Sequence, residues 1–252
     1  MKKLTRPGQF IFAVGIVALG VLQFFAKDFI VGRPPAAQWA SNIPGKQMWA
    51  FVSGALLITG GLSIIFYRRT ASTASLFIGI FIFIFSFLCR HLPQLFFATT
   101  TEDVIWQINA YKTLGLCGGA FIVSASFHQQ STAMQVTLSC VLLALFFLIS
   151  GFAHFKFHDF IINSFIPVYI PYRAFWTYFC GIALIAGGVG ILVKQTRKWA
   201  AALAGLMILL WFILLHIPRV SYSPGDCSEW MGVCESFAFS GILFTLAGLS
   251  SK

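Results

Sequence analysis

The chain has 252 residues, of which 58% are hydrophobic and only 10% are charged. A soluble domain carries about 25% charged residues, so this composition excludes a water-soluble globule and indicates that lipid covers most of the surface. The formal net charge of +10 does not indicate a nucleic-acid partner. The Lys and Arg residues lie in short clusters between apolar runs, a pattern typical of membrane anchoring and orientation.

The first apolar run follows the basic start Met1-Lys-Lys-Leu-Thr-Arg-Pro7 and so resembles a signal peptide. No A-x-A-like cleavage site follows it, and we interpret it as an uncleaved transmembrane helix. With this run, eight segments approach the length that crosses about 30 Å of hydrocarbon. The predicted spans are about 9–26, 47–66, 71–90, 111–127, 134–153, 174–193, 198–216 and 235–250.

The connections between these spans alternate in length and in charge. The short ones lie at 67–70, 127–131 and 194–198 and hold basic residues without acids. The longer ones, which hold nearly every acidic residue, lie at about 27–46, 91–110, 155–173 and 217–234. Lys and Arg divide almost evenly between the two sides. The Lys and Arg residues on the side of the short connections are clustered in tight loops, which favours cytoplasmic N- and C-termini.

The sequence contains an internal duplication. Three landmarks recur in order: Gly20–Phe29 as Gly151–Phe160, Pro44–Trp49 as Pro171–Trp176, and His91–Pro93 as His216–Pro218. Their offsets are 131, 127 and 125 residues, and we predict two repeats, 1–130 and 131–252. Each repeat holds an even number of spans, so the repeats would be parallel. The predicted fold class is all-α: a polytopic membrane protein with eight transmembrane helices in two parallel four-helix repeats.

Polar residues recur with the duplication at or near the span ends that enter the longer connections. The candidate pocket of the second repeat consists of His154, Asp159, Arg173, Trp176 and His216. The counterparts in the first repeat are Gln23, Asp28, Lys46, Trp49 and His91. Because Gln23 replaces a histidine, the first repeat has lost an ionisable group at that position. The second repeat therefore carries the richer set of groups for chemistry.

The two histidines of the second repeat have two interpretations. An ionisable residue within a span usually faces the bundle interior or a wet cavity, where His154 and His216 could relay a proton or bind a carbonyl. The alternative is that each histidine caps a neighbouring carbonyl for structural reasons.

We expect His154, Arg173 and His216 to converge on one pocket at the outer end of the second repeat. Span parity puts all three on one side of the membrane, and packed helices lie only about 8–10 Å apart. Asp159 is the expected partner of Arg173, because an unpaired cation at the edge of lipid is costly. The alternative is that Arg173 extends to the lipid headgroups and that the histidines face lipid.

Cys227 and Cys234 share a polar connection and are a candidate disulfide if that connection faces an oxidising compartment. Their spacing fits a redox-active C-x-x-C pair poorly. No spacing of histidines and cysteines matches a metal-binding or haem-attachment motif, so we predict neither a metal nor a haem.

Several segments of the second repeat together resemble the DoxX-like family of bacterial membrane proteins. They are Gly151-Phe-Ala-His-Phe155, Pro171-Tyr-Arg-Ala-Phe-Trp176, Gly181-Ile-Ala-Leu-Ile-Ala-Gly-Gly188 and Leu215-His-Ile-Pro-Arg219. The resemblance covers about 134–250, and the first repeat resembles a diverged copy of the same unit. Typical members have one four-helix unit, so two fused units are a departure. The family-like positions are His154, Asp159, Pro171, Arg173, Trp176, His216 and Pro218.

The resemblance implies the bacterial inner membrane and a membrane subunit of a redox system. A quinone would be the candidate cofactor, held between helices near the outer face, and a soluble or membrane oxidoreductase would be the partner. Two other functions stay open at this point, and so does the question of whether the chain is an enzyme. One is a carrier of a small or lipid-like molecule, because tandem parallel repeats suit a cavity at their interface. The other is a membrane anchor for a soluble enzyme.

Overall fold

The structure is a computed structural model that describes residues 1–30, 43–92, 96, 101–128 and 133–250. Within these ranges the regular structure is helical, and no strand occurs. The predicted all-α class is therefore confirmed for the described part of the chain.

Eight long helices make up most of the structure. They are α1 (Thr5–Ala26), α3 (Lys46–Phe66), α4 (Arg68–Phe81), α6 (Thr101–Ser126), α7 (Ala133–Lys156), α9 (Arg173–Leu192), α10 (Arg197–Trp211) and α12 (Cys227–Leu249). Two π-helices, η2 (Ile82–His91) and η4 (Phe212–His216), continue α4 and α10. The remaining elements are η1 (Lys2–Leu4), α8 (His158–Phe160), the π-helix η3 (Ile161–Phe165) and α11 (Ile217–Tyr222).

Seven helices of the described part are long and apolar enough to cross a membrane. They are Lys2–Ala26, Lys46–Phe66, Arg68–His91, Ala133–Lys156, Arg173–Leu192, Arg197–Tyr222 and Cys227–Leu249. Each corresponds to one predicted span, as expected of a multi-pass membrane protein. Helix α6 corresponds to the fourth predicted span but is not among the seven. Its sequence includes Glu102, Asp103 and Lys112, which lower its hydropathy.

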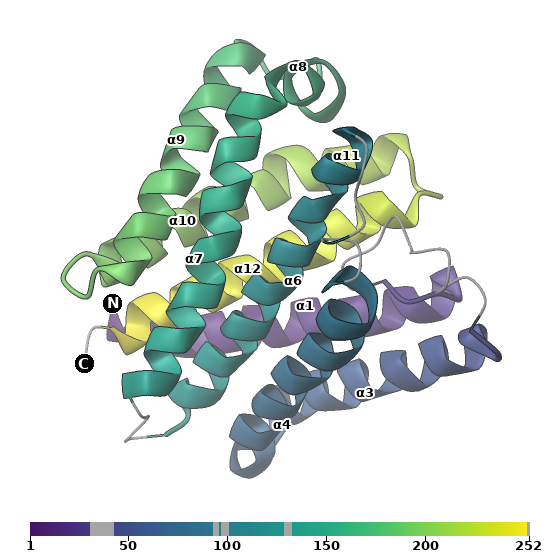
Figure 1. Cartoon of the computed structure of the whole chain (residues 1–252). Helices are drawn as coiled ribbons and strands as arrows, with labels where there is room; N and C mark the ends of the chain where they lie inside the picture. Colours follow the sequence, from purple (N-terminus) through teal and green to yellow (C-terminus); the bar gives the residue numbers. More distant parts are fainter. Residues whose placement is uncertain (31–42, 93–95, 97–100, 129–132, 251–252) are drawn as a thin grey trace.

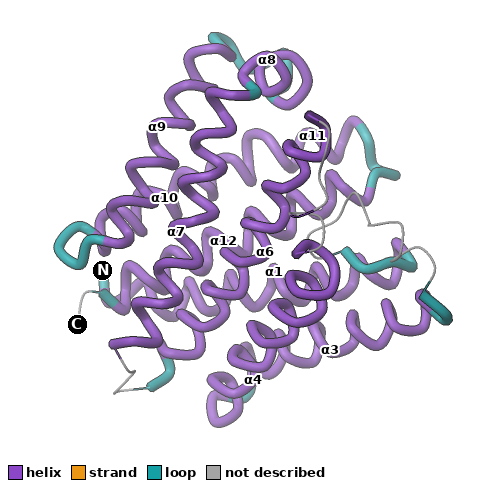
Figure 2. The backbone as a smooth tube through the Cα atoms, in the orientation of Figure 1, coloured by secondary structure: helices purple, strands orange, loops and turns teal. Residues whose placement is uncertain are grey.

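The long helices stack in two layers of four (Figures 1 and 2). One layer has the order α3, α1, α12, α10, and the other has the order α4, α6, α7, α9. Between the layers, α3 packs on α4, α10 on α9, and α12 on α6. This arrangement places α12 at the centre, where 72% of its most apolar window is buried, against 28–44% in the other spans.

Glycines allow the closest approaches between neighbouring helices. A Cβ added to Gly54 of α3 would lie 2.8 Å from the carbonyl oxygen of Gly20 in α1. A Cβ added to Gly181 of α9 would lie 3.2 Å from the carbonyl oxygen of Gly151 in α7. Helices associate in lipid through such small-residue contacts, because no hydrophobic effect drives them together there.

The last long helix begins earlier than its sequence pattern predicts. The span was expected to start near residue 235, but α12 starts at Cys227. The side chain of Asp226 caps the helix by accepting a hydrogen bond of 2.7 Å from the backbone N–H of Ser228. Most of the predicted connection 217–234 is therefore helical, as α11 and the first two turns of α12.

Candidate functional site

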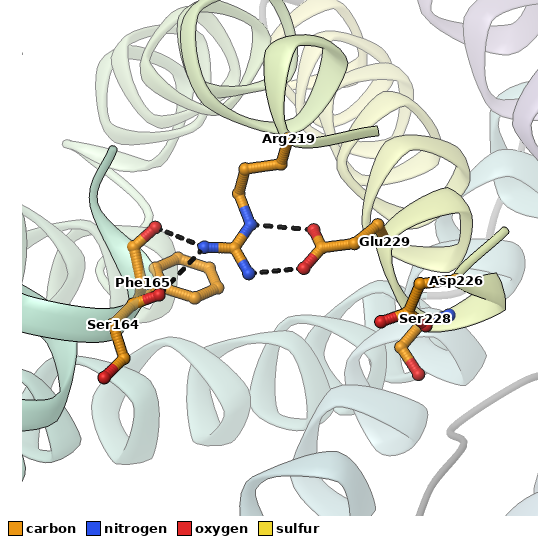
Figure 3. A network of polar contacts seen from close by, with 6 residues as sticks. All are labelled: Ser164, Phe165, Arg219, Asp226, Ser228 and Glu229. Carbon is orange, nitrogen blue, oxygen red and sulfur yellow. Dashed lines mark hydrogen bonds and ion pairs between the residues drawn. The ribbon is translucent and has the colours of Figure 1, made fainter. Parts of the chain in front are cut away.

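Arg219 of α11 links three elements (Figure 3), and α11 lies at the end of the molecule opposite the chain termini (Figure 1). Its Nε donates to Oε2 of Glu229 in α12 at 2.7 Å, and its Nη2 donates to Oε1 of the same carboxylate. Its Nη1 donates to the carbonyl oxygens of Ser164 at 3.2 Å and Phe165 at 2.5 Å. The planar guanidinium suits such a bidentate pair, and it also lies 4.7 Å from the ring centroid of Phe165.

Pro218 leaves one backbone carbonyl near Arg219 without its usual helical partner. It has no N–H to donate to the carbonyl of Leu214, four residues earlier, and the hydroxyl of Tyr169 donates to that carbonyl instead. Burial and the neighbouring Tyr222 raise the pKa of Tyr169, so the hydroxyl remains a donor at neutral pH. The His-Ile-Pro sequence thus ties the end of η4 to the connection that contains Tyr169.

His216 is the last residue of η4, and its ring packs against α12. A Cβ added to Gly232 would lie 2.7 Å from Nδ1 of His216, so glycine leaves the room that the imidazole occupies. The ring centroid is 6.1 Å from that of Phe165, in an edge-on arrangement of 75°. Nδ1 is buried and has no hydrogen-bond partner in the described part of the chain.

A second ion pair lies further along α12. Nζ of Lys112 in α6 is 2.6 Å from Oε2 of Glu235, and the two side chains are only 17% and 3% exposed. Oε1 of Glu235 is buried without a hydrogen-bond partner among the described residues. Ionisable residues inside spans are costly, and they usually pair with one another. The pair Lys112–Glu235 therefore compensates charge at the contact between α6 and α12.

Together these groups form the His216 cluster, which consists of Lys112, His216, Arg219, Glu229 and Glu235. Glu229, Gly232 and Glu235 follow at three-residue intervals along α12, and His216 contacts the middle position. The imidazole therefore lies between the two ion pairs along the helix. A neutral imidazole and a carboxylate can each take up a proton, so the cluster has the groups needed to accept and hold one within the apolar interior.

The structure does not join the three residues that were expected to converge. Nδ1 of His154 is 2.8 Å from the carbonyl oxygen of Ser150 on its own helix, and its ring centroid lies 6.3 Å from that of Trp211. Nη1 of Arg173 donates to the carbonyl of Ile162 at 2.8 Å. No hydrogen bond or ring contact links His154, Arg173 and His216, all of which are described.

The expected pair between Arg173 and Asp159 is wrong. The Asp159 side chain is 84% exposed, and its carboxylate lies 3.3 Å from Nε2 of His158. Arg173 instead binds the carbonyl of Ile162, the second residue of η3. Trp176 packs on the rings of Phe175 and Phe179 and is 40% exposed, like the aromatic residues of a membrane interface.

The first-repeat counterparts are engaged in structural contacts. Gln23 is buried, and its Nε2 donates to Oγ of Ser53 at 2.7 Å and to the carbonyl of Ala50 at 3.2 Å. Its Oε1 accepts a hydrogen bond from the Ile30 N–H at 3.2 Å. This amide therefore holds α1 to α3 and to the start of the following connection.

The remaining counterparts in the first repeat are an ion pair and two ring-bearing residues. Lys46 and Asp28 form an ion pair at 3.1 Å, so the cation–acid pair expected in the second repeat occurs at the matching positions of the first. Trp49 is 51% exposed, and His91 is buried at the end of η2.

The candidate disulfide between Cys227 and Cys234 is not formed, and both residues are free thiols. Both lie on α12, where seven residues correspond to about 10.5 Å along the helix axis. A disulfide requires Cα atoms within about 7 Å. The early start of α12 at the Asp226 cap is the physical reason for this difference. No group of three or more His, Cys, Asp or Glu residues in the described part is placed to hold a metal ion.

An open groove of about 600 Å³ lies between α6 and α7. Gln107 and Tyr111 of α6 line one side of it, and Phe152, Ala153 and Lys156 of α7 line the other. The two helices belong to different halves of the sequence. The groove is therefore formed where the predicted repeats meet.

Comparison with known proteins adds one match. Residues 143–219 match a family described as a domain of unknown function, DUF8561. The match covers less than half of the chain and includes His154, Arg173, His216 and Arg219. No curated protein and no solved structure matches the chain. The class that the fold defines is an all-helical protein with the helices of a multi-pass membrane protein.

Proposed function

We propose that the chain is a DoxX-like membrane subunit of a quinone-linked redox system. The observation that carries this proposal is the His216 cluster, which places ionisable groups within helices that are otherwise apolar. Such groups within spans typically mark proton relays or ligand sites. Oxidation of a quinol yields a quinone, two protons and two electrons. The electrons would pass to an oxidoreductase partner, and the protons need an acceptor in the membrane.

The residues of the cluster have distinct proposed roles. His216 would accept a hydrogen bond from the quinol hydroxyl at Nδ1, and Glu235 would take up the proton. Lys112 is the ion-pair partner of Glu235, with a contact of 2.6 Å. Arg219 is a positioning residue, because it holds η3 and α12 on either side of His216. His154 is the second candidate partner for a quinone carbonyl, since its ring lies beside Trp211 in the helix that leads to His216.

We also propose that residues 1–130 and 131–252 are structural repeats, with α6 as the eighth span. Equivalent glycine contacts support this: Gly20 meets Gly54 as Gly151 meets Gly181. Further along the same helix pairs, a Cβ at Gly61 would lie 2.9 Å from the Ala13 carbonyl, and one at Gly188 would lie 3.2 Å from the Ala144 carbonyl. In this proposal the chain lies in the bacterial inner membrane, and its termini are cytoplasmic.

The test is to purify the protein in a mild detergent and to identify bound isoprenoid quinone by mass spectrometry. We expect quinone to copurify with the wild type and to be lost from His216→Ala and Glu235→Gln variants of normal abundance. His128→Ala is the matched control, because His128 is exposed and contacts Ser72 at 2.6 Å, away from the cluster. Absence of quinone from the wild type, or its retention in His216→Ala, would contradict the proposal.

A carrier of a small lipid-like molecule is the second candidate function. The groove between α6 and α7 favours it, because tandem parallel repeats place their binding cavities at the repeat interface. Reconstitution into liposomes separates the two functions. A carrier moves its substrate across a sealed bilayer without any electron acceptor, whereas a redox subunit requires one.

A further inference from the structure

The groove between α6 and α7 extends from the interior of a span to its end. Its lining on α7 begins at Ile149 and continues to Lys156, which is in the last turn of that helix. Seven residues of α-helix correspond to about 10 Å. One end of the groove therefore lies at the depth of hydrocarbon, and the other lies where the span emerges among lipid headgroups.

The two ends of the groove differ in chemistry. Phe152 and Phe155 are 59% and 39% exposed and supply apolar surface along α7. Lys156 is exposed, and its Nζ lies 5.5 Å from the ring centroid of Phe157. No carboxylate pairs with Lys156 in the described part of the chain. Gln107 and Tyr111 add donor groups on the α6 side.

We propose that this groove binds an anionic phospholipid of the surrounding bilayer. One acyl chain lies along the exposed phenylalanines, and the phosphate is held by Lys156. The volume of about 600 Å³ is within the range of about 300–1,000 Å³ for small-molecule sites. A cation at the headgroup end of an apolar groove favours a headgroup with net negative charge. This inference does not depend on the quinone proposal.

Native mass spectrometry of the full chain provides the test. The delipidated protein is titrated with phosphatidylglycerol or with phosphatidylcholine of the same acyl chains, and with the corresponding free fatty acid. We expect the wild type to prefer phosphatidylglycerol over phosphatidylcholine by about fivefold, the effect of one Lys near a membrane surface. Lys156→Gln should lose this preference, and Lys156→Arg should keep it.

Lys198→Gln is the matched control. Nζ of Lys198 also lies 5.5 Å from the ring of the next residue, Trp199, but Lys198 does not line the groove. This variant should keep the preference for phosphatidylglycerol. An equal preference in Lys156→Gln and the wild type would overturn the proposal, and so would tighter binding of the fatty acid than of the phospholipid. Absence of quinone from the wild type before delipidation, together with an intact lipid preference, would contradict only the quinone function.

Discussion

Lys112 and Glu235 form a buried ion pair of 2.6 Å at sequence positions that are 123 residues apart. This separation is close to the offsets of 131, 127 and 125 residues that relate the duplicated landmarks. The opposite charges lie in α6 and α12 and meet where these helices pack. A contact of this kind requires both halves, since neither partner is compensated without the other.

Removal of one partner of this pair should destabilise the protein strongly. Lys112→Met leaves Glu235 buried without compensation, and the expected loss is about 3–5 kcal/mol. The double variant Lys112→Met/Glu235→Leu should recover most of it, because an apolar pair can replace a buried ion pair. Thermal unfolding in detergent measures both, with Lys194→Met as the exposed control. A double variant as unstable as the single one would contradict this account.

The close approach of α7 and α9 should not tolerate a methyl group. In Gly181→Ala the new Cβ would lie 2.9 Å from Cβ of His154 and 3.2 Å from the Gly151 carbonyl oxygen. Overpacking of this kind costs about 1–3 kcal/mol. The reactivity of buried cysteines during heating reports the unfolding midpoint. Gly225→Ala is the control, because no atom lies within 4 Å of its added Cβ, and an equal shift in both variants would refute the packing argument.

The contacts of Arg219 should protect η3 from local opening. Arg219→Lys keeps a positive charge but loses the bidentate contact with Glu229 and the donors to Ser164 and Phe165. We expect faster amide hydrogen exchange in Ile161–Phe165 than in the wild type. Glu229→Gln retains the guanidinium and its carbonyl contacts, so its effect on that segment should be smaller. Unchanged exchange in Arg219→Lys would show that η3 is held by other contacts.

The two cysteines of α12 should differ in reactivity and should need no prior reduction. In a Cys89→Ser background, a membrane-impermeant maleimide should label Cys227 in intact cells, because the helix begins there on the side opposite the termini. Cys234, which is 6% exposed, should remain unlabelled. Labelling of Cys227 only after lysis would overturn the cytoplasmic placement of the termini. A requirement for reductant would indicate a disulfide.

The lengths of the apolar segments predicted the helices well. In lipid, the backbone N–H and C=O groups of an apolar segment must be hydrogen-bonded within that segment, and a helix does this. The errors lie at helix ends, where local polar contacts decide. The Asp226 cap extended α12 by two turns beyond its apolar segment. The pattern Asp226-Cys-Ser-Glu229 resembles a capping box and was the available signal.

The site was less predictable than the fold. His216 was identified from its place at the end of a span, whereas Arg219, Glu229, Lys112 and Glu235 were not among the candidate residues. Partners that are distant in sequence depend on how helices pack, and span parity gives only the side of the membrane. Arg173 illustrates this limit, because its guanidinium donates a hydrogen bond to a backbone carbonyl of η3 and not to Asp159.

The π-helix η4, which ends at His216, determines how the cluster responds to the deletion of one residue. A π-helix contains one more residue per turn than an α-helix, and each α-helical residue advances the chain by roughly 100°. Deletion of a single residue from η4 (Phe212–His216) would restore an ordinary α-helix. The helix that follows would keep its rotational phase relative to α10, because the wider turn already absorbs the extra residue. The imidazole of His216 would then stay beside Gly232, so a one-residue deletion that would disperse the cluster in a regular α-helix leaves it assembled here.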